Sequence, residues 1–180
     1  MSGAPADADA RDAALFDGAV FCDVVARLRI EPGPLPPEAF EVAERLLHDL
    51  AALEERRAEG DDGHAGDPAL KRLEAKLDLT LQLLAQALPG LAPLPAKAIR
   101  LGPRGVRLAE PAHAAGTDAV LVWQPGEGLP LTLRLPVRAL DGGVPSRRWA
   151  FPPLPDGLQD ALERHVFRLH RRALAAQRRG

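Results

Sequence analysis

Few side chains in this sequence are suited to catalysis. The chain contains no tyrosine, and its only serines are Ser2 and Ser146. Neither serine lies in the Gly-x-Ser-x-Gly turn that exposes the nucleophile of many hydrolases. The sequence also lacks a phosphate-binding loop ending in Lys-Ser or Lys-Thr, and it lacks a dinucleotide-binding glycine pattern. Because no local motif indicates an enzyme, we expect a non-enzymatic protein.

The five histidines do not form a metal-binding pattern. His165 and His170 are five positions apart, which places them on different faces of a helix, so they are not spaced as a helical metal-binding pair. His48, His64 and His113 are scattered along the chain. We therefore expect core or surface histidines rather than metal ligands, and no bound metal or cofactor.

Charge is distributed unevenly along the chain. Residues 1–69 contain 6 basic and 16 acidic side chains, a net charge of −10, whereas residues 70–180 contain 17 basic and 9 acidic, a net charge of +8. Either the second half meets an anionic partner, or oppositely charged segments or subunits complement one another. A nucleic-acid-binding module is a third hypothesis. It has weak support, because aromatic residues make up 4% of the chain and, beyond Trp149 and Phe167, none accompanies the basic cluster.

A leucine-rich stretch at residues 67–88 is the strongest pattern in the chain. Asp67 is a suitable N-cap, Pro68 suits the first helical position, and Pro89 ends the helix. Its main row of leucines recurs in steps of three and four along one face: Leu70, Leu73, Leu77, Leu81, Leu84 and Leu88. Leu79 and Leu83 add a second row, so the apolar surface is wider than a two-stranded coiled coil needs. The helix therefore either lies in the core of its own domain or packs against copies of itself.

The rest of the sequence predicts one α+β domain after a disordered tail. Apolar residues alternate with other residues from Val20 to Ile30, which is typical of a strand with one face on a core. Short alternating runs separated by glycine-containing turns predict a small barrel. The expected segments are a disordered tail at 1–14 and a domain at 15–180 with a strand at 19–30, a helical insert at 37–88, barrel strands within 97–151 and a C-terminal helix at 156–178.

Compartment signals are few but consistent with one another. A single cysteine, Cys22, excludes an internal disulfide and suits a reducing cytosol. The first 14 residues have neither the charge nor the apolar core of a signal peptide. No apolar run reaches the roughly 20 residues that span a bilayer. We therefore expect a cytoplasmic protein.

The order of these elements resembles that of atypical PilZ-domain proteins, in which a helical segment interrupts the PilZ barrel. The matching stretches are Leu73 to Leu81, the strand pair around Leu101 to Leu108, and the end from Leu162 to Arg172. The resemblance implies a bacterial signalling domain whose usual ligand is cyclic di-GMP. It also implies a homotetramer assembled through the leucine helix, with signalling or motility proteins as partners.

Typical PilZ domains bind cyclic di-GMP through two motifs, and this chain departs from both. Before the first strand, where the family has Arg-x-x-x-Arg, the chain has only Arg11. The second motif is Asp/Asn-x-Ser-x-x-Gly. Here Arg100 replaces the acid or amide, Gly102 replaces the serine, and only Gly105 matches.

The degenerate second motif still offers cationic groups to an anion. Its candidate ligand-binding residues are Arg100, Gly102, Arg104 and Gly105, because guanidinium groups bind phosphates and stack on guanine. The resemblance thus leaves two hypotheses. One is an adaptor that self-associates through its leucines, and the other is a cyclic di-GMP receptor with a rearranged site.

Overall fold

A computed structural model describes residues 4–61, 69, 72–73, 75–77, 79–80, 83, 93–112, 117–126, 131–141 and 145–178. The elements in chain order are α1 (Ala4–Phe16), β1 (Cys22–Pro32), α2 (Glu38–Asp61), β2 (Ala96–Gly102), β3 (Gly105–Ala112), β4 (Asp118–Gln124), β5 (Leu133–Ala139), β6 (Ser146–Ala150) and α4 (Asp156–Gln177). Among the described residues, no helix combines the length and apolar character needed to cross a bilayer.

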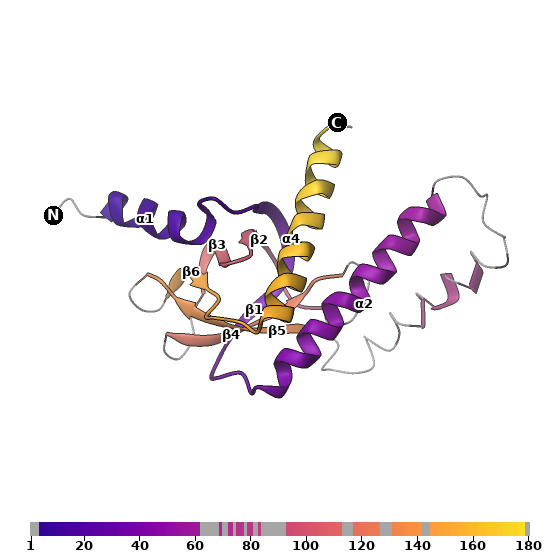
Figure 1. The fold of residues 1–180 in the computed structure, drawn as a ribbon, viewed down its shortest axis with the longest axis horizontal. Helices are drawn as coiled ribbons and strands as arrows, with labels where there is room; N and C mark the ends of the chain where they lie inside the picture. The colour runs from indigo at the N-terminus through magenta and orange to yellow at the C-terminus, as the bar shows by residue number, and fades with distance from the viewer. Residues whose placement is uncertain are drawn as a thin grey trace.

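The six strands form a closed barrel in the order β1-β2-β3-β6-β5-β4 (Figure 1). All neighbouring strands are antiparallel. The alternation seen in the sequence places Ala26 and Leu28 of β1, and Leu133 and Leu135 of β5, inside the barrel core. The predicted small antiparallel barrel with a C-terminal helix is therefore confirmed. The helical insert leaves after β1 and returns at β2, two strands that are hydrogen-bonded to each other.

Helix α4 packs against the barrel, and α2 packs against α4 and β5. The buried side of α4 consists of Leu158, Ala161, Leu162, His165 and Val166. A methyl group at Gly157, in the first turn of α4, would overlap the Glu44 carboxylate of α2. The first turn of α4 therefore lies directly against the end of the Glu44 side chain.

Helix α1 (Ala4–Phe16) covers residues 4–14 of the segment that was expected to be a disordered tail, and residues 1–3 of that segment lie outside the described residues. The helix runs to Phe16, and its last two residues, Leu15 and Phe16, are 1% and 6% exposed. The acidic, alanine-rich composition of the segment indicates disorder, but alanine also has the highest helix propensity, and Leu15 and Phe16 pack the end of the helix against β2 and β3. Gly18, with φ of +66°, follows the helix and turns the chain towards β1.

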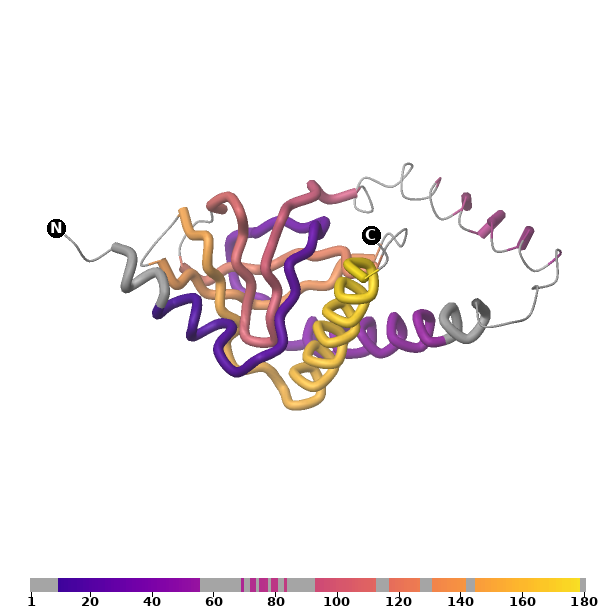
Figure 2. Tube along the Cα trace, turned by 90° about the horizontal axis from the view of Figure 1, so that it is seen from above, coloured from indigo at the N-terminus to yellow at the C-terminus, as the bar shows by residue number. Residues whose placement is uncertain are grey.

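The leucine-rich stretch is described at residues 69, 72–73, 75–77, 79–80 and 83, all of which are helical. In Figure 2 these short helical pieces lie away from the barrel. Among them, Leu73, Leu77, Leu79 and Leu83 are each 53–56% exposed. The other leucines of the main row, Leu70, Leu81, Leu84 and Leu88, lie outside the described residues, as do Asp67 and Pro68.

Candidate functional site

The four residues of the degenerate motif lie together where β2 turns into β3. Arg100 and Gly102 are in β2, Arg104 is in the turn, and Gly105 begins β3. A Cβ atom at Gly102 would lie 3.0 Å from the ring of Phe16, and one at Gly105 would overlap the Trp149 carbonyl. Both glycines therefore have a packing role here, because they leave room for α1 and for strand β6.

Arg100 is held by residues of its own chain. Its Nε donates to Asp23 Oδ1 at 2.8 Å and its Nη2 donates to Asp23 Oδ2 at 2.7 Å. Its guanidinium carbon lies 4.5 Å from the ring centroid of Phe21 and 5.9 Å from that of Phe16. The hydrogen bond from Arg100 holds the pKa of Asp23 below its usual value. A phosphate would have to compete with this carboxylate for the same guanidinium.

Arg104 supports the turn and the end of α1. Its Nη1 donates to the backbone oxygen of Asp17 at 3.3 Å, and its own carbonyl accepts a hydrogen bond from Phe151 N at 2.8 Å. The side chain thus joins the β2–β3 turn to the residue that follows α1.

Three arginines lie in cross-strand register on neighbouring strands. Arg100 of β2 pairs with Arg107 of β3, which pairs with Arg148 of β6, and Asp23 of β1 flanks Arg100. We call Arg100, Arg107 and Arg148 the arginine row. Like charges directly opposite each other destabilise a sheet, so this row requires nearby carboxylates.

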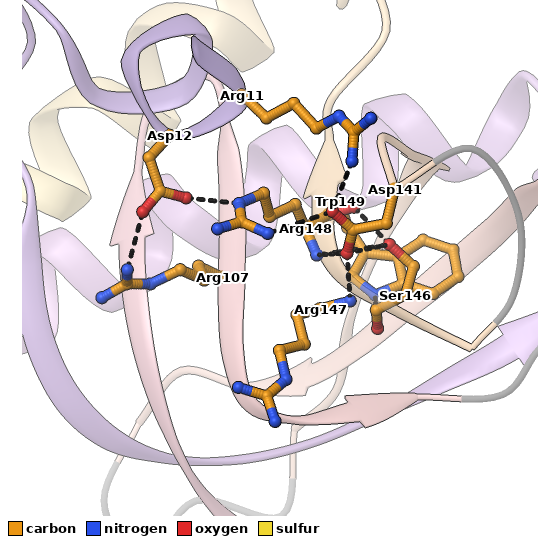
Figure 3. Close-up of polar contacts among 8 residues, drawn as sticks. All are labelled: Arg11, Asp12, Arg107, Asp141, Ser146, Arg147, Arg148 and Trp149. Atoms are coloured by element: carbon orange, nitrogen blue, oxygen red, sulfur yellow. Dashed lines mark hydrogen bonds and ion pairs between the residues drawn. The ribbon is translucent and has the colours of Figure 1, made fainter. Parts of the chain in front are cut away.

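One of these carboxylates is Asp12 of α1 (Figure 3). Its Oδ2 accepts a hydrogen bond from Arg107 Nη1 at 2.7 Å, and its Oδ1 accepts one from Arg148 Nε at 2.5 Å. A single carboxylate therefore bridges two arginines of the row. Charge-assisted hydrogen bonds of this kind are about twice as strong as neutral ones.

Asp141 completes the network beyond β6 (Figure 3). Its Oδ2 accepts hydrogen bonds from the backbone N of Arg147 and Arg148, and Ser146 Oγ lies 3.0 Å away. Its Oδ1 lies 3.1 Å from Arg148 Nη1 and 3.6 Å from Arg11 Nη1. Burial acts to raise the pKa of Asp141, but the hydrogen bonds outweigh it and the pKa lies below its usual value. Ser146 is fully buried in this network, which indicates a structural role.

A shallow, open depression lies beside the arginine row on the outer face of β1, β2 and β3. Its volume is about 360 Å³, and it is lined by Asp23, Val24, Val25, Ala98, Ile99, Arg100, Arg107 and Ala109. Small apolar side chains form much of its floor, and Arg100 and Arg107 supply positive charge. This surface could accept an anion only where the arginines are released from Asp12 and Asp23.

The network also accounts for the uneven charge of the sequence. Acidic residues from the first third of the chain pair with arginines from the rest: Asp12 with Arg107 and Arg148, Asp23 with Arg100, Glu31 with Arg134, and Glu54 with Arg168 and Arg172. The interpretation that oppositely charged segments complement one another is therefore confirmed for these pairs.

The described histidines on α4 have structural surroundings. His165 is fully buried, lies edge-on to Trp123 with ring centroids 5.2 Å apart, and has its pKa lowered to about 4 by burial. Its Nε2 has no hydrogen-bond partner among the described residues. His170 Nδ1 lies 2.7 Å from the Phe21 carbonyl oxygen. No group of three His, Cys, Asp or Glu residues in the described part of the chain could hold a metal ion.

Cys22 is a buried core residue. Burial, assisted by the charge of Asp23, raises the pKa of its thiol to about 11. The thiol is therefore protonated at neutral pH and is a poor nucleophile.

Comparison with known proteins identifies the family. The model of the atypical PilZ domain, described as a cyclic di-GMP receptor, matches residues 47–179. The chain belongs to the atypical PilZ family. This PilZ chain is also similar to a solved structure of a pathogenic protein from Xanthomonas campestris, described as a new tetrameric PilZ domain self-assembled via an unusual helical bundle. The two are 35% identical, with 95% of this chain and 99% of that chain covered and a TM-score of 0.69. No curated protein matches the chain.

Two surfaces of this PilZ chain are candidates for a functional role. One consists of the exposed leucines that the structure describes in the insert, Leu73, Leu77, Leu79 and Leu83. The other is the arginine row with its covering helix α1. Sequence reasoning identified Arg100 but missed the roles of Asp12, Asp141 and Arg148, because these depend on the pairing of β3 with β6 and on the docking of α1.

Proposed function

We propose that this PilZ chain is a non-enzymatic, cytoplasmic signalling adaptor that forms a homotetramer through its leucine-rich helix. The main supporting observation is the exposure of Leu73, Leu77, Leu79 and Leu83, each more than half accessible in the single chain. Covering four half-exposed leucines contributes roughly 3–6 kcal/mol per subunit before association costs are subtracted. Each subunit that joins the bundle would add this burial free energy.

The two rows of leucines support a bundle of more than two helices. Leu73 and Leu77 belong to the main row, whereas Leu79 and Leu83 belong to the second, and both rows are exposed. A helix with two apolar rows can contact neighbours on both sides. A tetramer self-assembled via a helical bundle is also the description of the similar protein from Xanthomonas campestris.

The test is the molar mass of the Leu77→Asp variant, measured by sedimentation or light scattering. Four copies of the 19.3 kDa chain give about 77 kDa, and the variant should approach the mass of one chain. Leu131→Asp is the matched control, because Leu131 is also an exposed leucine, 43% accessible, but precedes β5 of the barrel. Unchanged mass for Leu77→Asp would reject the proposal.

A second candidate function is a cyclic di-GMP receptor with a rearranged site. Its support is the family description together with the depression beside Arg100 and Arg107. Binding of the ligand in the usual way is disfavoured, because the Arg100 guanidinium already contacts Asp23 and the Phe21 ring. Calorimetry with cyclic di-GMP separates the two functions. Micromolar binding that is lost in Arg100→Ala and Arg104→Ala supports the receptor, and the absence of binding heat supports the adaptor.

A further inference from the structure

The surface beneath α1 is shaped for particular side chains of a helix. The Cδ1 of Phe16 lies 3.0 Å from the position of a Cβ at Gly102, and the Cδ2 of Leu15 lies 2.6 Å from that of a Cβ at Gly105. Beside these two glycines, Arg107 and Arg148 bind the Asp12 carboxylate. We call Gly102, Gly105, Arg107 and Arg148 the α1 seat.

The α1 residues that occupy this seat have a simple spacing. Asp12, Leu15 and Phe16 are at positions i, i+3 and i+4, which lie on one face of a helix. Two guanidinium groups recognise the carboxylate, and the two glycines leave space for the apolar side chains. The seat therefore distinguishes an acidic–apolar helix from an apolar helix without the carboxylate.

The contacts of α1 are of a kind that can exchange. The carboxylate that bridges the arginines is 25% exposed, and Arg107 is 35% exposed, so water and salt reach this ion pair. The helix is followed by Gly18 at a positive φ, a residue type that adapts easily to a changed chain direction. Release of α1 would uncover both glycines and two cations together.

We propose that the α1 seat is a docking site for a helix of a partner protein, with α1 as its resident occupant in the free chain. The partner helix carries a carboxylate followed at the third and fourth positions by large apolar residues. Charge complementarity favours this partner, because α1 itself contributes the carboxylate that the arginines of the seat require. This inference does not depend on the proposed oligomer, since the contacts described at the seat join α1 to β2, β3 and β6 and involve no described residue of the leucine-rich helix.

The test uses full-length chains and a labelled synthetic peptide of residues 1–18 with an amidated C-terminus, followed by fluorescence anisotropy. In the Asp12→Asn chain helix α1 is held less firmly, so the peptide should bind about five-fold more tightly than it binds the wild-type chain. Adding Arg148→Gln to this chain should weaken peptide binding about ten-fold, because the carboxylate of the peptide loses one of its two donors.

Peptide variants separate docking from general attraction between charges. The Asp12→Asn peptide should lose about ten-fold in affinity, whereas the Asp17→Asn peptide, with the same loss of charge at an exposed side chain, should keep its affinity. Equal affinities for these two peptides, or no binding to the Asp12→Asn chain at millimolar concentration, would overturn the proposal. If the Asp12→Asn chain does not fold, the Leu15→Ala chain serves as the loosened receptor. The peptide should bind it at least about ten-fold more tightly than the wild-type chain, and the peptide variants should keep the same order of affinity.

One further outcome would assign the seat to a different occupant. If the molar mass of the wild-type chain rises with concentration beyond its resting oligomer, and Arg148→Gln abolishes that rise, α1 is exchanged between copies of this chain. That result would overturn the proposal of a partner protein. The Leu77→Asp experiment reports on the leucine-rich helix instead, so the two proposals can fail separately.

Discussion

Helix α1 and the leucine-rich helix both lie outside the barrel, but they differ in how their apolar residues are covered. Leu15 and Phe16 of α1 are almost completely buried, whereas Leu73, Leu77, Leu79 and Leu83 are more than half exposed. The segment with fewer large apolar residues is thus the better covered one. Burial depends on a complementary surface, and for α1 the barrel provides two glycines and two arginines.

This difference bears on which surface covers the exposed leucines of the leucine-rich helix. The described part of the chain leaves Leu73, Leu77, Leu79 and Leu83 more than half exposed, which supports the proposal that another polypeptide completes their cover. Helix α1 is covered by the barrel of its own chain, whereas in our proposal the leucine-rich helix is covered between subunits. Substitutions in α1 should therefore change stability, and substitutions in the leucine-rich helix should change assembly.

The largest expected effect comes from filling the seat of α1. Gly105→Val would place a side chain on the Trp149 carbonyl and on Leu15, and we expect a loss of about 3 kcal/mol or more in the free energy of unfolding. Gly102→Ala meets only the edge of the Phe16 ring, so it should cost about 1 kcal/mol. Chemical denaturation checks both values, and equal losses would contradict the assigned roles of the two glycines.

A pair of leucine substitutions tests the comparison directly. Leu15→Ala removes a fully buried side chain and should lower the free energy of unfolding by about 2–4 kcal/mol without changing the molar mass. Leu77→Ala removes an exposed side chain and should weaken the oligomer instead. Denaturation of both variants at low protein concentration, together with sedimentation, separates the two effects. A Leu77→Ala chain that is destabilised as a monomer would contradict the distinction.

Helix α4 is a third helix outside the barrel, and its buried face carries a titratable side chain, that of His165. Burial lowers the pKa of His165 to about 4, whereas the unfolded chain has an ordinary histidine with a pKa near 6.5. The unfolded state therefore binds the proton more strongly, so stability is fully present above about pH 6.5 and is lost as the pH falls towards 4. At pH 5 the loss should be about 2 kcal/mol.

Denaturation from pH 7 to 5 measures this loss, with His165→Phe as the comparison. The phenylalanine variant should show a smaller decrease over the same range, because the group responsible has been removed. The same slope in both proteins would assign the decrease to other groups.

The smallest expected effect concerns the carboxylate of α1. Asp12→Asn should lower the free energy of unfolding by about 1 kcal/mol, because it removes a charge that bridges two arginines but is partly exposed to water. Asp17→Asn, at an exposed residue after α1, is the matched control. Added salt should reduce the difference between the wild type and Asp12→Asn. Persistence of the full difference in 1 M salt would indicate a packing effect rather than an ion pair.

Much of the barrel was predictable because its strands bury alternate residues. The expected strand at 19–30 corresponds to Cys22–Pro32, and the expected C-terminal helix at 156–178 corresponds to Asp156–Gln177. The pairing of strands was not predictable, since neither the spacing nor the types of residues indicate that Arg107 lies opposite Arg148. The docking of α1 was also missed, because only Leu15 and Phe16 distinguish it from an acidic tail.

The candidate site was predictable in part for the same reason. The sequence identified Arg100 and Arg104 as cations near a turn, but only the fold shows that Asp23 and the Asp17 backbone already bind them. For the leucine-rich helix, periodicity predicted the apolar face. It could not decide whether the covering residues come from the same chain, because leucines follow one spacing in both cases.

The point of insertion of the helices has a consequence for evolution. The helical insert begins after β1 and ends at β2, and these two strands are hydrogen-bonded to each other. The entropic cost of closing a loop rises only slowly with its length. Residues can therefore be added to or removed from the helical insert while the six strands of the barrel keep their pairing. In the proposed tetramer, the distance between neighbouring barrels can thus be adjusted independently of the surface that each barrel displays.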